Sequence, residues 1–337
     1  MQAAWAKYRL EFRFLARTSR ESMSVKDTYF IKLTDSDGRT AYGECALFRG
    51  LSADDMPDYE VQLGHYCRHL DQVSSCPYSS IRFGIETAMA NLGHDAGGAW
   101  HSGNIRIPIN GLIWIGDKQE MSRRIDEKLA AGFNVLKLKI GSIGFDDELD
   151  LLRMIRKRYS GDTLELRLDA NGAFSPDDAL KKLDRLSLFG IHSIEQPVRA
   201  GQHDLMHRLC RTSPIPIALD EELIGRDPSI LASISPAYII LKPALCGGLS
   251  GAEAWAEAAE RLGIGYWFTS ALESNIGLDA IAGLAAKRGI GMPQGLGTGQ
   301  LYHNNIEGPI FLHGSSLCYN PDKQWQIPQL DWHTMLS

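Results

Sequence analysis

The sequence predicts an α/β protein in which a small α+β module precedes a parallel βα barrel. With 337 residues, the chain is long enough for one large domain and one smaller domain. Its first part carries strand patterns followed by helical patterns, which is typical of α+β modules. Its second part alternates short β-like runs with amphipathic helices about every 25 to 30 residues, which favours a parallel barrel.

Alternating apolar residues predict three strands at the start of the chain. The first covers residues 5–14 and the second covers residues 29–33. The second strand runs into Asp37-Gly38, a dipeptide typical of hairpin turns, and residues 40–44 form the third strand. An antiparallel hairpin with one further strand is therefore expected.

Two segments of this module are expected to be loops that close over a ligand. One is the polar stretch 17–24 between the first two strands, and the other is Phe48-Arg49-Gly50 in the loop 45–51. A lid of this kind keeps water away from charged groups on a barrel rim and strengthens their interactions. An ordinary mobile surface loop is the alternative interpretation.

Helical patterning then begins at residue 58 and again covers residues 79–92, before a polar, glycine-rich stretch ends the module. We therefore place an α+β domain at residues 1–104 and expect part of the C-terminal tail, 300–337, to join it. The barrel is placed at residues 105–299.

The barrel elements follow from the same patterns. Strands are expected at residues 105–109, 112–115, 135–140, 164–169, 193–195, 217–220, 238–242, 266–270 and near Gly291. Helices are expected at residues 117–132, 145–159, 176–188, 205–211, 228–233, 248–262 and 276–288. The alternative is an open, doubly wound sheet. No Gly-x-Gly-x-x-Gly turn follows the first strand, which argues against it.

Charge and composition limit the expected partners. The net charge is −6 and no basic tract is present, so neither nucleic acid nor an anionic membrane surface is expected. The six cysteines are scattered without a Cys-x-x-Cys pair, which indicates reduced thiols rather than disulfides or a zinc site. Neither a signal peptide nor a membrane-spanning run is recognisable, so we expect a cytoplasmic protein acting on a small molecule. The oligomeric state stays open.

Two lysines, Lys137 and Lys139, stand two residues apart in the apolar run 135–141. Successive strand side chains point to opposite faces, so both lysines share one face. If that face is interior, burial and mutual repulsion lower the pKa of the lysines toward the range in which a neutral amine is a base. A solvated strand edge protected by lysines is the alternative.

Five charged residues end successive predicted strands: Lys139, Asp169, Glu195, Asp220 and Lys242. They lie about 22 to 30 residues apart, one βα unit each, so they should gather on the C-terminal rim, where barrel enzymes hold their active sites. A single aspartate after a strand is more often a helix N-cap, but five successive charges form a pattern. Three converging carboxylates require a cation, and oxygen ligands favour Mg²⁺, with Mn²⁺ next.

This arrangement also predicts a reaction. A metal ion that holds a substrate carboxylate, flanked by two lysines, is suited to removal of the proton α to that carboxylate. Negative charge then develops on the carboxylate oxygens, where the metal and a lysine ammonium group stabilise it.

Five segments resemble the signature of the enolase superfamily, in its muconate-lactonizing subgroup. They are residues 136–139, 167–172, 194–197, 218–221 and 240–243. The resemblance covers essentially the whole chain and implies a modified (β/α)7β TIM-type barrel with an α+β capping domain. It also implies that Asp169, Glu195 and Asp220 bind the metal, that Lys139 and Lys242 are the acid/base lysines, and that Lys137 tunes Lys139. Arg167 and Asn171, which lie in the same segments, are expected to support these groups.

Three further segments, residues 109–114, 269–277 and 295–298, resemble a dehydratase branch of the subgroup. This resemblance implies a metal-dependent syn elimination of water, with Ser270, Leu296 and Gly297 near the substrate. Dipeptide epimerases carry an acidic Asp-x-Asp where this chain has glycines, which disfavours them. Racemisation of an N-acylated amino acid stays open as a rival, with cycloisomerisation behind it. A non-catalytic binding barrel would be expected to have lost at least one of the five charged residues.

Overall fold

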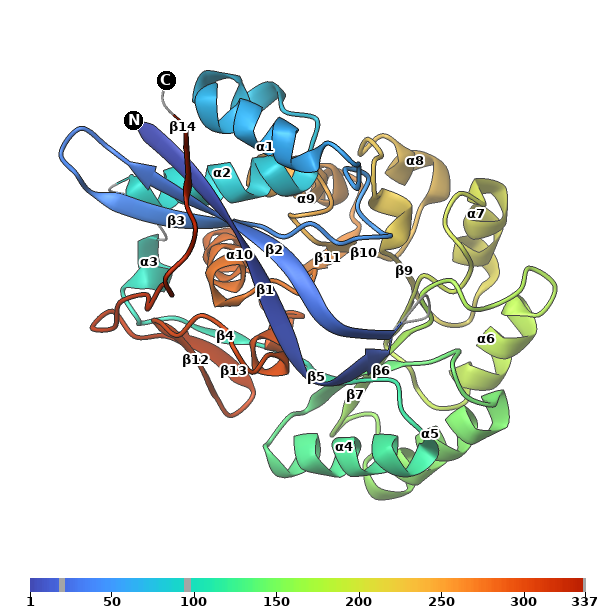
Figure 1. Cartoon of the computed structure of the whole chain (residues 1–337). Helices are drawn as coiled ribbons and strands as arrows, with labels where there is room; N and C mark the ends of the chain where they lie inside the picture. Colours follow the sequence, from blue (N-terminus) through green and yellow to red (C-terminus); the bar gives the residue numbers. More distant parts are fainter. Residues whose placement is uncertain (18–21, 94–97, 336–337) are drawn as a thin grey trace.

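The computed structural model describes residues 1–17, 22–93 and 98–335, and within them the strands form three sheets (Figure 1). A seven-stranded parallel sheet curves to form the barrel, and a four-stranded antiparallel sheet lies across one side of it. A three-stranded sheet near the C-terminus completes the set. The parallel barrel is therefore confirmed, and the open-sheet alternative is wrong.

The barrel strands follow one another in chain order around the sheet, as expected for successive right-handed βα units. They are β5 (Gly111–Ile113), β6 (Val135–Lys139), β7 (Glu165–Asp169), β8 (Ser193–Glu195), β9 (Ile217–Leu219), β10 (Tyr238–Leu241) and β11 (Gly265–Phe268). Each pair of neighbours is parallel, and the register aligns Lys139 with Asp169 and Asp169 with Glu195. Three predicted rim residues are thus neighbours across adjacent strands.

Two predictions differ from the structure at the point where the barrel closes. The run 105–109 does contain a strand, β4 (Arg106–Pro108), but it lies outside the barrel and pairs with β13 (Ser316–Tyr319). No strand forms near Gly291. Single parallel bridges, from Ile109 to Gln294 and from Thr269 to Gly295, join the two ends of the sheet instead. The closing segment makes too few ladder contacts to count as a strand.

Helices cover the outside of the barrel (Figure 1). They are α4 (Lys118–Ala130), α5 (Phe145–Arg158), α6 (Ala179–Ser187), α7 (His203–Thr212), α8 (Ile230–Ile234), α9 (Gly248–Arg261) and α10 (Asn275–Arg288), with the short 3₁₀ turns η2 (Glu221–Leu223) and η3 (Gly297–Leu301). The start of α4 is fixed by a capping box, in which Asp117 accepts from the Glu120 N–H at 2.8 Å and Glu120 accepts from the Asp117 N–H. The predicted helix positions are confirmed to within a few residues.

The N-terminal unit, defined here as β1, β2, β3, β14, α1 and α2, is an antiparallel sheet backed by helices. Its strands are β1 (Gln2–Arg17), β2 (Ser22–Thr34), β3 (Thr40–Cys45) and β14 (His333–Met335), and its helices are α1 (Tyr59–Arg68) and α2 (Ser79–Leu92). The remaining elements are η1 (Leu70–Ser75), α3 (Gly98–His101), β12 (Ile310–His313) and β13 (Ser316–Tyr319). Because β14 pairs with β1, the C-terminal tail lies in the same sheet as the start of the chain.

The residues of the segment 17–24 that the structure describes lie in strands rather than in the expected loop. Arg17 belongs to β1 and residues 22–24 belong to β2, whereas residues 18–21 lie outside the described part of the chain. The two strands therefore form a long hairpin that reaches across the barrel (Figure 1).

Two large apolar cores hold the molecule together, one in the barrel and one in the N-terminal unit. The second core contains Cys45, Cys67 and Cys76, and all six cysteines are free thiols, as expected from their spacing. The sheet and α2 approach so closely that a Cβ on Gly43 would lie 1.9 Å from the carbonyl oxygen of Gly84. In the described ranges, no helix is both long enough and apolar enough to cross a membrane.

Candidate active site

A group of paired charges occupies the C-terminal rim of the barrel. The Lys137 ammonium group lies between two carboxylates, 3.0 Å from Asp169 Oδ2 and 2.5 Å from Glu195 Oε2. Lys139 Nζ lies 3.1 Å from the same Asp169 oxygen. The structure therefore brings both lysines of the strand β6 pair to one interior face, and the solvated-edge interpretation is wrong.

The other side of the rim repeats this pairing. Lys242 Nζ, just beyond β10, donates to Asp220 Oδ2 at 2.5 Å, and Asp220 follows β9. Asp169, Glu195 and Asp220 are each at most 2% exposed. All five rim residues predicted from the sequence thus form ion pairs at this rim, in one group around Asp169 and in a second pair of Asp220 with Lys242.

The pKa of Lys137 departs from the sequence prediction. Burial lowers it, but the attraction of Asp169 and Glu195 is larger in sum and raises the pKa of Lys137 above its ordinary value. The carboxylates of the neighbouring strands therefore outweigh lysine–lysine repulsion. The same holds at Lys242, whose pKa is raised although burial opposes the shift.

The carboxylates respond in two opposite ways. Burial alone would raise the pKa of Asp169, but the three lysines of the rim hold it well below its ordinary value. Burial and the nearby Asp169 charge raise the pKa of Glu195 well above its ordinary value. Burial and the neighbouring carboxylates therefore outweigh the contact of Glu195 with Lys137.

A divalent cation fits this donor set. Oxygen Oε1 of Glu195 and oxygen Oε2 of Glu221 are buried without a hydrogen-bond partner. Across residues 1–17, 22–93 and 98–335, no three carboxylate, imidazole or thiol groups converge closely enough to form a complete metal cage. The lysines explain this, because Lys137 occupies the space between Asp169 and Glu195. A cation would replace the lysine contacts and satisfy the unpartnered oxygens.

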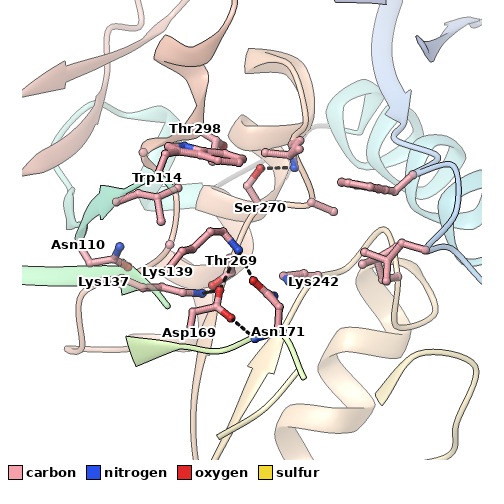
Figure 2. Close-up of a pocket in the computed structure, with 18 of the residues that line it drawn as sticks. Asn110, Trp114, Lys137, Lys139, Asp169, Asn171, Lys242, Thr269, Ser270 and Thr298 are labelled. Carbon is pink, nitrogen blue, oxygen red and sulfur yellow. Dashed lines mark hydrogen bonds and ion pairs between the residues drawn. The ribbon is translucent and has the colours of Figure 1, made fainter. Parts of the chain in front are cut away.

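A pocket of about 100 Å³ opens at this rim (Figure 2). Its charged and polar walls include Lys139, Asp169 and Lys242, and Figure 2 shows these side chains around one space. The volume is below the roughly 300 Å³ at which ligand pockets usually begin. The lysine–carboxylate contacts must therefore loosen, or the walls must move, before a substrate enters.

The predicted substrate contacts lie in different places. Ser270 and Gly297 line the pocket, whereas Leu296 is 1% exposed and packs in the barrel core. The hydroxyl of Ser270 is already engaged, because it donates to Glu273 and accepts from the Leu272 N–H at 2.9 Å. It therefore has little capacity left for a substrate.

Arg167, which was expected to support the charged groups of the site, is the register neighbour of Lys137 on β7. It lies two residues before Asp169 on β7, one layer deeper in the barrel, with its guanidinium 4.4 Å from the ring centroid of Trp267. Its Nε donates to Glu165 at 2.7 Å and its Nη1 to the Pro293 carbonyl at 2.9 Å. These contacts hold the Arg167 side chain in the barrel interior, below the site.

Asn171 meets Lys139 directly, and it introduces a residue that the sequence reasoning missed. Asn171 Oδ1 accepts from Lys139 Nζ at 2.6 Å, while its Nδ2 donates to Glu221 Oε1 at 3.0 Å. Burial and the Asp220 charge raise the pKa of Glu221 to about 7. The adjacent acidic residues 220 and 221 were the available sequence signal. Neighbouring strand residues point to opposite faces, so only one of the two can end the strand facing inward.

Gln196 is a second residue that sequence reasoning missed. It is fully buried with a left-handed φ of 43°, and its side-chain oxygen accepts from the N–H groups of Asp220 and Glu222. Gln196 therefore ties the end of β8 to the end of β9 and fixes the backbone that carries Asp220.

The segment Phe48-Arg49-Gly50 lies at the pocket mouth. Phe48 and Leu51 line the pocket, and Asp55 accepts from Arg49 at 2.6 Å and from the Gly50 N–H at 2.7 Å. These contacts give the segment a defined shape around apolar side chains that face the charged rim. Whether the segment also closes on a ligand stays a prediction.

Comparisons with known proteins agree with this architecture. A family model described as Enolase C-terminal domain-like matches residues 120–308. The o-succinylbenzoate synthase of Desulfotalea psychrophila is 42% identical over 94% of this chain and 98% of its own length. The crystal structure of MenC from the same organism has a TM-score of 0.78, with 39% identity over 94% of this chain and 99% of that one.

A more distant structure shares the fold alone. The dipeptide epimerase from Cytophaga hutchinsonii, complexed with Mg and D-Ala-L-Val, is 20% identical with a TM-score of 0.84 over 100% of this chain and 99% of that chain. The fold is thus the TIM-type barrel of these enzymes, and the much higher identity to the synthase places the chain on its branch. The chain belongs to the enolase superfamily and, within it, to the o-succinylbenzoate synthase family.

Proposed function

We propose that the protein is an o-succinylbenzoate synthase. It eliminates water in a syn sense from 2-succinyl-6-hydroxy-2,4-cyclohexadiene-1-carboxylate and forms 2-succinylbenzoate for menaquinone biosynthesis. The observation that carries the proposal is the presence of two lysines on one pocket, Lys139 and Lys242, from strands separated by three others in the barrel. The similarity to a synthase over 94% of the chain supports it independently.

Lys139 is the proposed base. Its amine lies in the pocket wall, where the Asn171 carbonyl oxygen accepts from it at 2.6 Å and keeps it in position. Lys139 removes the proton from the ring carbon that bears the carboxylate and then delivers it to the departing hydroxide, which leaves as water. The electron pair of the broken C–H bond enters the ring, which becomes aromatic.

Lys242 is the proposed electrostatic partner. Its raised pKa keeps it protonated, and it lies across the pocket from the strand that carries Lys139. An ammonium group in this buried setting stabilises the negative charge of the enediolate that forms on proton removal. Lys137, held by Asp169 and Glu195, helps to keep Asp169 charged beside the base.

Mg²⁺ is the proposed cofactor, with Asp169, Glu195 and Asp220 as its ligands and Mn²⁺ as a substitute. When bound, the ion would neutralise the carboxylates and draw negative charge from the substrate carboxylate. The unpartnered oxygen of Glu195 supports this assignment. The Mg-complexed epimerase of the same fold supports it by analogy.

The division of the chain follows the same proposal. Residues 1–104 form the capping domain with part of the tail 300–337, and residues 105–299 form the catalytic barrel. The pairing of β14 with β1 supports the inclusion of the tail. The proposed location is the cytoplasm, where the substrate would be a small dicarboxylate.

A second candidate function is racemisation of an N-acylated amino acid. Two lysines on one pocket favour it, because each could exchange a proton with one face of the α-carbon. Epimerisation of dipeptides and cycloisomerisation rank lower. The glycine pair at 295 and 297, which has no carboxylate for a substrate amino group, disfavours the epimerases.

The deciding experiment supplies each substrate to the purified protein with Mg²⁺. We expect rapid dehydration of the cyclohexadiene substrate, followed by the absorbance of the aromatic product. An N-succinyl amino acid in D₂O, followed by α-proton exchange and optical rotation, should react slowly or not at all. Rapid racemisation without dehydration would reverse the assignment.

A further inference from the structure

Helix α2 of the N-terminal unit packs against the start of the barrel helix α9 (Figure 1). The hydrogen bonds of this contact join residues that are 164 and 168 positions apart in the chain. Helix α9 follows β10 through the β10–α9 loop, defined here as residues 242–247. The loop begins with Lys242, which lines the pocket together with Leu245. Whatever holds this loop therefore affects the position of Lys242.

The β10–α9 loop is a tight turn closed by its own backbone. The Lys242 carbonyl accepts from the N–H groups of Leu245 at 2.8 Å and of Cys246 at 3.1 Å. The Pro243 carbonyl accepts from the Gly248 N–H at 2.9 Å. Because these bonds connect the first turn of α9 to Lys242 and Pro243, a shift of the helix start is transmitted to Lys242.

Helix α9 takes the acceptors for its first turn from α2. The first N–H groups of a helix lack partners within the helix, and the N-cap of α9 is Gly247, which has no side chain to offer. Instead, Ser79 Oγ accepts from the Gly247 N–H at 3.0 Å, and Glu86 Oε2 accepts from the Ser250 N–H at 3.1 Å. Glu86 Oε1 also accepts from the Ser250 hydroxyl. The N-terminal unit thus caps a helix of the barrel.

Two glycines allow α2 to come this close. Gly247 and Gly248 have φ values of 95° and 78°, in the left-handed region that favours glycine. A Cβ on Gly248 would lie 2.6 Å from Glu86 Oε2 and 2.9 Å from Arg82 Cγ, which is closer than normal van der Waals contact. The pair Gly247-Gly248 is therefore suited to this contact, which a side chain at position 248 would push apart.

Helix α2 is itself held in place. The Arg82 Nε donates to Glu86 Oε1 at 2.9 Å and so fixes the capping carboxylate. On the β3 side of α2, a Cβ on Gly84 would lie 2.8 Å from the backbone nitrogen of Cys45. Cys45 ends β3 and leads to Phe48 at the pocket mouth. One helix therefore packs against the strand that leads to the pocket mouth and against the loop that carries Lys242.

We propose that Glu86 and Ser79 are positioning residues, which cap α9 and thereby hold the β10–α9 loop so that Lys242 is aligned for catalysis. The effect on turnover rests on the proposed synthase activity, whereas the cap itself does not. Neither side chain belongs to the described pocket wall, so both act through the loop. Lys242 stabilises charge that develops in the transition state, so a displaced loop should lower kcat more than it raises KM.

The test uses Glu86→Ala, Ser79→Ala and the conservative variant Glu86→Gln, with Glu253→Ala as the matched control. Glu253 is a glutamate of α9 itself, and it forms an ion pair with Lys287 at 2.6 Å. Hydrogen–deuterium exchange of the whole protein, without substrate or metal, measures the cap independently of activity. Steady-state kinetics with the cyclohexadiene substrate and Mg²⁺ then separate kcat from KM.

Glu86→Ala should speed amide exchange in residues 242–250 by at least about fivefold, because a helix cap is lost. Exchange in residues 135–141, on the opposite side of the pocket, should stay unchanged. The kcat should fall by about tenfold while KM changes by less than about threefold, since small displacements of a catalytic group are costly. Ser79→Ala should change exchange and kcat in the same direction but by less.

Glu86→Gln should restore both exchange and kcat to within about threefold of the wild type. Its amide can still accept from the Ser250 N–H and can donate to the Ser250 hydroxyl oxygen. Glu253→Ala should match the wild type in both measurements. A fall in kcat as large in Glu253→Ala as in Glu86→Ala would show that any lost carboxylate at this boundary has the same effect, and would overturn the proposal.

Unchanged exchange of residues 242–250 in Glu86→Ala rejects the cap. Faster exchange there with an unchanged kcat, or with a change in KM alone, rejects the positioning of Lys242. If Glu86→Ala does not fold, Ser79→Ala decides by the same two measurements. A wild type that does not dehydrate the substrate rejects the proposed function but not the cap, which the exchange measurement still tests.

Discussion

Two layers inside the same barrel surround their buried charged side chains with different kinds of partner. At the rim, Lys137, Lys139 and Asp169 share contacts of 3.0 to 3.1 Å around a pocket that a ligand can enter. One layer below, Arg167 lies on the ring of Trp267 and is closed in by Glu165 and the Pro293 carbonyl. Asp169 and Arg167 are only two residues apart on β7, so depth in the barrel, rather than sequence position, separates their roles.

The difference lies in which partners can be exchanged. The rim lysines form ion pairs with carboxylates that an incoming cation could bind instead. These lysine–carboxylate contacts can therefore be exchanged. Arg167 contacts an aromatic face, a backbone carbonyl and the Glu165 carboxylate, and none of these three groups lines the pocket. The rim should therefore control activity and metal binding, and the lower layer should control stability.

The largest expected effect is at the proposed base. Lys139→Ala should reduce dehydration by at least about 1,000-fold, because general-base catalysis is lost, with little change in the unfolding midpoint. Turnover and the exchange of the substrate α-proton in D₂O measure this. Lys181→Ala, at an exposed position on α6, is the control. Normal turnover by Lys139→Ala would remove it from the mechanism.

The next effect tests the lower layer. Arg167→Met should destabilise the fold by about 3 kcal/mol, since it removes a cation–π contact and two hydrogen bonds. Dehydration should stay within about threefold of the wild-type rate under conditions where the variant is folded. Urea unfolding and steady-state kinetics check the two parts. A large loss of activity without loss of stability would show that the two layers are not separate.

The third effect concerns the cation. Glu195→Gln and Asp220→Asn should each weaken Mg²⁺ binding by about 100-fold, roughly 2.7 kcal/mol, while the fold is kept. Calorimetric titration with Mg²⁺ alone measures this without substrate. Chelation of the metal should abolish dehydration in the wild type, and added Mg²⁺ should restore it. Unchanged affinity in both variants would rule out these ligands.

The smallest expected effect is a pH dependence of the unfolding free energy, caused by a residue outside the barrel interior. Glu148, on α5, accepts from the Gly141 N–H at 2.5 Å, and burial raises its pKa to about 6 from the ordinary 4.5. Because the folded pKa is the higher one, the folded protein binds more protons between pH 4.5 and 6, and stability falls as pH rises through this window.

Replacement by Gln removes that titration. The unfolding free energy of the wild type, relative to Glu148→Gln, should therefore fall by about 2 kcal/mol from pH 4 to pH 7. Urea unfolding at several pH values measures the difference, and other carboxylates cancel because both proteins carry them. A difference that is constant with pH would contradict the buried titration of Glu148.

The sequence by itself determined the order of the elements and the place of the rim charges. A charged residue that ends each of five βα units must reach the same end of a parallel barrel, because parallel strands share one direction. The spacing of Lys137 and Lys139 likewise determined that they share a face. These inferences depend only on local periodicity, which the chain carries in its own order.

Only the tertiary structure decided which charges meet. The pKa of Lys137 rises rather than falls because the side chains of Asp169 and Glu195, from the next two strands, contact its ammonium group. Closure through Gln294 and Gly295 and the depth of Arg167 depend in the same way on packing between distant segments. Burial then sets the strength of each interaction, and no local pattern contains that quantity.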